Sequence, residues 1–161
     1  MKEALRIMRE QGKGWVKVAK EGAVWTDGRI LVLDSNIFDL PGGEYSYQAE
    51  SKTFIPGKMP DYEAVIPKDG NGYLEVEPVR EHGCLKLLKR EYKKQYIVSL
   101  AGNGVKQHIR HLFFECLLNL PSSGSGGIDN WKASRNKYDP VLFFQGETLK
   151  AVVMPIDIDR E

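Results

Sequence analysis

The amino-acid sequence predicts an α+β fold, an antiparallel sheet with helices packed on one face. Two observations support this prediction. Short segments that alternate apolar and polar residues follow one another closely through the first third of the chain, which is typical of a strand meander with antiparallel pairing. Apolar residues also recur at helical spacing near the start of the chain and again between residues 105 and 120.

The first half of the chain begins with a predicted helix over residues 2–11. Leu5 and Met8 lie three residues apart, and Gly12 and Gly14 can end the helix because glycine tolerates positive φ. Turn residues then separate a series of short apolar runs. These runs predict strands at 15–20, 23–25, 30–33, 45–49 and 52–55.

The second half is predicted to mix strands and longer helices. The expected elements are a strand at 73–77, a helix at 84–94, a strand at 96–100, a helix from about Val105 to Leu120, and strands at 141–144 and 149–154. The second of these helices rests on one apolar stripe, formed by Ile109, Leu112, Phe113, Cys116, Leu117 and Leu120. Serine and glycine residues predict a flexible loop at 121–130.

Composition narrows the classes of protein to consider. A chain of 161 residues suits a single domain over 1–161, and a hydrophobic share of 42% is too high for a disordered chain. The net charge of +1 does not by itself require a nucleic-acid partner, so any such argument depends on where the charge lies. Two cysteines make no disulfide scaffold, and Cys116 suits a core position. We expect a cytoplasmic protein with no membrane partner.

Three segments together carry a family resemblance. They are Thr26-Asp27-Gly28-Arg29-Ile30-Leu31, the run from Met59 to Lys68 that contains Pro-Asp-Tyr, and Val152-Val153-Met154-Pro155-Ile156. A Thr-Asp-Gly turn, a Pro-Asp-Tyr…Pro segment and a terminal Met-Pro strand occur in this order in bacterial DNA sliding clamps. From about Ala23 onward the chain therefore resembles the DNA polymerase III beta subunit, which implies a sliding-clamp-like fold.

The resemblance also implies a binding pocket for short peptides of polymerases and repair proteins. By position, the pocket would be formed by Thr26, Gly28, Leu31, Pro60, Val65, Val152 and Met154. The chain departs from the family pattern, because Arg29-Ile30 stands where His-Arg is usual and Glu63-Ala64 stands where basic residues are usual. The plainer alternative is that the three segments are a turn, a Pro-bounded loop and a core strand.

Basic residues on predicted helix faces form the second candidate site. Clamp helices offer diffuse positive charge to duplex DNA without reading its sequence, which supports processivity in DNA replication. The candidate DNA-binding residues are Arg6, Arg9, Lys13, Lys86, Lys89, Arg90, Lys93, Lys106 and Arg110. A single domain cannot encircle DNA, so a ring would require a homo-oligomer. The alternative is that each charged face is only solvated.

The function expected from these patterns is a non-catalytic, DNA-associated clamp-like module without cofactor or metal. One alternative is a protein-interaction or regulatory module that has the clamp-like fold and no DNA role. A less favoured alternative is a Mg²⁺-dependent nuclease that uses Asp61, Glu91 and Lys93. That chemistry needs Glu and Lys two apart on one side of a strand, whereas Glu91 and Lys93 fall in a predicted helix.

Overall fold

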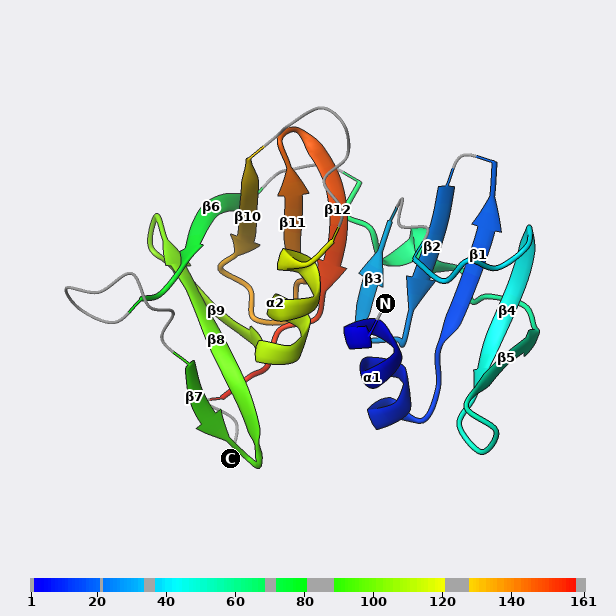
Figure 1. Cartoon of the computed structure of the whole chain (residues 1–161). Coiled ribbons are helices and arrows are strands. Elements are labelled where there is room, and N and C mark those ends of the chain that lie inside the picture. Colours follow the sequence, from blue (N-terminus) through cyan, green and yellow to red (C-terminus); the bar gives the residue numbers. More distant parts are fainter. Residues whose placement is uncertain are drawn as a thin grey trace. The chain divides into compact units, whose positions relative to one another are not determined.

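The computed structural model describes residues 2–20, 22–33, 37–68, 72–80, 89–120 and 128–158. The contacts divide the chain into two units, Met1–Pro67 and Lys68–Glu161 (Figure 1). Strands pair antiparallel in both units, and each unit carries one α-helix among its described residues. The antiparallel sheet with helices is thus confirmed, while the likeness to a sliding clamp and the single domain stay predictions.

The elements of the first unit are α1 (Lys2–Gln11), β1 (Trp15–Ala19), β2 (Gly22–Thr26), β3 (Ile30–Val32), β4 (Gly43–Gln48), β5 (Thr53–Pro56) and the 3₁₀ turn η1 (Tyr62–Val65). In this unit, β1 to β3 form the predicted meander, and β4 returns to pair with β1. The strands lie in the order β5-β4-β1-β2-β3. The predicted strands 15–20, 23–25, 30–33, 45–49 and 52–55 agree with these strands to within two residues at each end.

Two groups of apolar side chains fill the core of the first unit. An aromatic cluster runs from Trp25 to Phe38, at 6.1 Å between ring centroids, and from Phe38 to Phe54, at 5.3 Å. Helix α1 buries Ala4, Ile7 and Met8. The predicted helix is confirmed, but its buried face is centred on Ile7, which the spacing of Leu5 and Met8 did not indicate.

The second unit is built around one long strand. Its elements are β6 (Tyr73–Pro78), β7 (Lys89–Tyr92), β8 (Gln95–Gly102), β9 (Val105–Arg110), α2 (His111–Leu118), β10 (Asp129–Ser134), β11 (Val141–Gln145) and β12 (Thr148–Val153). Strand β8 pairs with β9 along one edge, and β7 and β6 share its other edge. The order then continues from β6 through β10 and β11 to β12.

Two helix predictions in this unit are wrong. Residues 89–92 of the predicted helix 84–94 form strand β7, and residues 84–88 lie outside the described part of the chain. In the predicted helix 105–120, residues 105–110 form strand β9, and only His111–Leu118 is helical. The physical reason is a hairpin turn in each case. The Lys93-Lys94 turn pairs β7 with β8, and the Asn103-Gly104 turn pairs β8 with β9 and draws the residues after it into the sheet.

Strand β10 replaces the end of the predicted loop at 121–130. Residues 121–127 lie outside the described part, and β10 begins at Asp129. Trp131 of this strand is buried against Phe143, at 4.6 Å between ring centroids, and stacks on Phe114 of α2 at 5.5 Å. Helix α2 thus covers the core of this unit where β10 and β11 lie (Figure 1). No helix among the described residues has the length and apolar character to cross a membrane.

Candidate functional site

The predicted peptide pocket draws its residues from both units. In the first unit, Thr26 and Leu31 are buried, whereas Gly28, Pro60 and Val65 are exposed. In the second unit, Val152 is buried in β12, and Met154 lies exposed just after that strand. The pocket and its peptide ligands therefore stay predictions.

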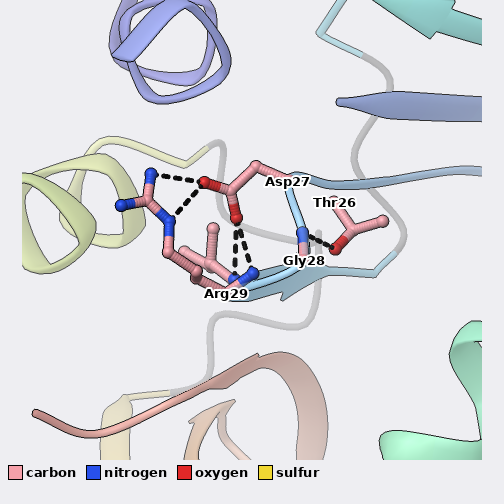
Figure 2. A network of polar contacts seen from close by, with 5 residues as sticks. Thr26, Asp27, Gly28 and Arg29 are labelled. Carbon is pink, nitrogen blue, oxygen red and sulfur yellow. Dashed lines mark hydrogen bonds and ion pairs between the residues drawn. The ribbon is translucent and has the colours of Figure 1, made fainter. Parts of the chain in front are cut away.

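The Thr-Asp-Gly turn between β2 and β3 is a closed network of polar contacts (Figure 2). The Asp27 carboxylate is fully buried and accepts hydrogen bonds from the backbone N–H groups of Arg29, at 2.7 Å, and Ile30, at 3.1 Å. The Arg29 guanidinium donates two further bonds to Asp27 Oδ2, at 2.9 and 2.7 Å. The hydroxyl of Thr26 accepts a bond from Gly28 N–H at 3.0 Å. These contacts hold the turn in its conformation, so a structural role is enough to explain the Thr-Asp-Gly motif.

The predicted DNA-binding residues separate into two groups, one in each unit. Arg6 and Arg9 are exposed on α1, Lys13 follows that helix, and Arg6 is paired with Glu10 at 3.2 Å. The second group lies on β7, on β9 and in the turn after β7, so the prediction that these residues share helix faces is wrong. It contains Lys89, Arg90, Lys93, Lys106 and Arg110, while Lys86 lies outside the described residues.

Strands β7, β8 and β9 form what we call the basic ribbon, residues 89–110. Six basic residues and one acidic residue give this segment a formal net charge of +5 with its histidine neutral, against +1 for the whole chain. All of its lysines and Arg90 are exposed, and Arg110 is half-buried. The basic ribbon therefore carries a local excess of positive charge, which the total charge conceals.

Strand register distributes this charge between the two faces of the basic ribbon. Arg90 and Arg110 both pair with Ile97, so their side chains leave the same face. Lys106 pairs with Ala101, four residues beyond Ile97, and belongs to that face as well. Lys89 pairs with Val98 and lies on the opposite face.

The hairpin turn between β7 and β8 is conformationally costly. Its central residues, Lys93 and Lys94, have φ of 47° and 65°. The turn between β8 and β9 also has two central residues of positive φ, Asn103 at 53° and Gly104 at 77°. Asn-Gly is the favoured pair in such turns, whereas a lysine in the left-handed region costs about 1–2 kcal/mol. The basic ribbon therefore places two lysines at its tip at a cost in stability.

Because of this strain, replacing Lys93-Lys94 with the Asn-Gly pair of the second turn is expected to stabilise the protein. The Lys93→Asn, Lys94→Gly variant is expected to unfold about 2–4 °C higher than the wild type, for roughly 1 kcal/mol gained. The matched control is Gly104→Ala, which should lower the unfolding temperature by a similar amount because alanine is strained at φ 77°. Circular dichroism melting measures both. A lower melting temperature for the first variant would contradict the strain.

Aromatic rings accompany the charges on the ribbon. The Lys89 ammonium lies 4.5 Å from the ring centroid of Tyr96, and Lys93 lies 5.4 Å from that of Tyr92. Tyr96 is 51% exposed, so its ring is accessible from solvent. The pKa of His111, the first residue of α2, is lowered by burial and further by Lys89, while Glu115 opposes the shift. Lys89 thus lies near the start of α2, on the helix side of the ribbon.

Sequence reasoning missed two members of this surface. Lys94 falls out of step with the helical spacing of Lys86, Lys89 and Lys93, so a helical pattern does not include it. Tyr96 falls in a predicted strand, where the sequence pattern gives it no binding role. The pattern Lys-Arg-Glu-Tyr-Lys-Lys-Gln-Tyr does interleave basic and aromatic residues, and this composition was the available indication.

The candidate nuclease residues are divided between the two units. Asp61 lies before η1 in the first unit, with no side-chain capping bond. In the second unit, Glu91 lies on β7 and Lys93 lies in the strained turn, outside the strand. Across the ranges that the structure describes, no group of three or more His, Cys, Asp or Glu residues could hold a metal ion.

Comparison with known proteins identifies no relative: no family model, no curated protein and no solved structure matches this chain.

Proposed function

We propose that this chain is a non-catalytic module that binds duplex DNA through the basic ribbon, without reading the base sequence. The observation that carries the proposal is the charge of +5 on residues 89–110 in a chain of net charge +1. Lysine and arginine side chains of this kind bind phosphates and release counterions from the DNA.

The strained turn adds independent support. Strain in a backbone persists where the surrounding structure or the function requires it, and here it keeps two lysines at the tip of the ribbon. An Asn-Gly turn of the same kind occurs ten residues later in the same ribbon, so the fold itself accepts the cheaper sequence. We infer that the lysines at the tip serve binding and not folding.

The proposal is tested with a variant that neutralises the hairpin. Lys89, Arg90, Lys93 and Lys94 are all changed to glutamine, and the control changes four exposed lysines of the first unit, Lys2, Lys20, Lys52 and Lys58, in the same way. Both variants lose four charges. The affinity for a fluorescent 30-base-pair duplex is measured by anisotropy, and intact DNA after incubation with Mg²⁺ is checked on a gel.

The hairpin variant is expected to bind about 30- to 1,000-fold more weakly than the wild type, at roughly 0.5–1 kcal/mol for each lost phosphate contact. The control should stay within about threefold. A duplex of scrambled sequence should bind like the first, because phosphate contacts carry no base information. If the hairpin variant and the first-unit control lose the same affinity for DNA, only the total charge matters, and the proposed site on the basic ribbon is refuted.

A further inference from the structure

The hairpin of β7 and β8 carries an exposed aromatic ring among its lysines. Tyr96 is 51% exposed, and the Lys89 ammonium lies 4.5 Å from the centroid of its ring. Tyr96 pairs with Glu91, two residues after Lys89 on β7, so the three side chains leave the same face of the hairpin. The ring is thus restrained by a cation on one side, while about half of the residue's surface stays open to solvent.

The charges around Tyr96 favour phosphates near the ring but not against it. Lys89 makes no ion pair with any residue that the structure describes. Along the hairpin, Tyr96 lies between Lys89 and the turn that carries the two exposed lysines of the tip. Glu91 is directly opposite Tyr96, where its carboxylate repels a phosphate. The phosphates of a bound strand would therefore lie at the lysines and leave the ring to a base.

We propose that Tyr96 stacks on an unpaired base, so that the basic ribbon binds a duplex that continues into a single strand more tightly than a blunt duplex. This inference rests on the proposed binding of DNA by the ribbon. Bases inside a duplex stack on one another, whereas an unpaired base has a face free for an aromatic side chain. Such stacking tolerates any sequence, so it agrees with binding that does not read the bases.

A second tyrosine of the same unit serves as the matched control. Tyr138 is 67% exposed, and the Lys137 ammonium lies 5.6 Å from the centroid of its ring. That ammonium also lies 3.1 Å from Asp157 Oδ2, so its charge is compensated. Tyr138 lies between β10 and β11, outside the basic ribbon. The two tyrosines thus share a neighbouring lysine and differ in the charge around them.

The test compares two 30-base-pair duplexes that carry single-stranded overhangs of equal charge. One overhang has five adenosines, and the other has five abasic residues, which keep the phosphates and lack the bases. The affinities of the wild type, Tyr96→Leu, Tyr96→Phe and Tyr138→Leu are measured by fluorescence anisotropy, with the overhang at either end of the strand and with a blunt duplex. Circular dichroism verifies that each variant is folded.

The wild type is expected to bind the adenosine overhang about fivefold or more tightly than the abasic overhang. Tyr96→Leu should abolish this ratio, whereas Tyr96→Phe and Tyr138→Leu should retain it. Equal binding of the two overhangs by the wild type, or a ratio that survives in Tyr96→Leu, would overturn stacking at Tyr96 and leave the proposed function standing if the blunt duplex still binds. Failure to bind any of these DNAs would overturn both.

Discussion

Replacing Asp27 with alanine is expected to lower the free energy of unfolding by about 3–5 kcal/mol, the cost of breaking a buried ion pair by removing one partner. The carboxylate is 0% exposed, and its loss would leave two backbone N–H groups and the Arg29 guanidinium without their acceptor. A native domain is stable by only about 5–15 kcal/mol, so this single change threatens folding of the first unit.

The measurement is urea unfolding followed by tryptophan fluorescence, since Trp25 lies on β2, next to the turn. Asp27→Asn retains an oxygen acceptor and should lose less stability than Asp27→Ala. Asp61→Ala is the control, because Asp61 is exposed and makes no capping bond, and it should change the free energy by no more than about 0.5 kcal/mol. A loss for Asp27→Ala below about 1 kcal/mol would mean that the network contributes little.

The affinity of the wild-type protein for duplex DNA is expected to fall by about 1,000-fold between 50 and 200 mM salt. This follows if all six basic residues of the ribbon contact phosphates, since each contact contributes roughly 0.9 to the slope of log K against log salt. With the four hairpin residues changed to glutamine, two contacts remain. The same change in salt should then cost only about tenfold.

The slope of log K against log salt tests the site more sharply than the affinity does. A partly misfolded variant binds more weakly, but misfolding gives no reason for the slope to fall by the amount expected from four lost phosphate contacts. The first-unit control variant should keep the wild-type slope. If the hairpin variant also keeps the wild-type slope, its four side chains do not contact phosphates, and the charge on the ribbon is only a solvated surface.

The fold was predictable from the sequence where each strand pairs with the next strand along the chain. Strands β1 to β3 are separated by turns that contain glycine and pair with their sequence neighbours, so short apolar runs bounded by turn residues were enough to predict them. Residues 105–120 failed because Ile109 continues the apolar stripe of the true helix backwards into β9. The same residues also alternate, with Val105, Gln107 and Ile109 buried, and the Asn103-Gly104 pair decides between the two patterns.

The candidate site was predictable only as a list of basic residues. Lys89, Arg90, Lys106 and Arg110 were identified from the sequence, but their arrangement depends on the register of three strands. Arg90 and Arg110 share one face because both pair with Ile97 from opposite sides of β8, and no periodic pattern encodes this pairing of residues that lie 20 apart in the sequence.

The most direct test of the proposed DNA site is lysine footprinting, in which lysines are acetylated with and without a 30-base-pair duplex and quantified by mass spectrometry. We predict that Lys89, Lys93, Lys94 and Lys106 become several-fold less reactive with DNA, while Lys20, Lys52 and Lys58 do not change. Protection confined to lysines of the first unit, or spread evenly over the chain, would contradict binding through the basic ribbon.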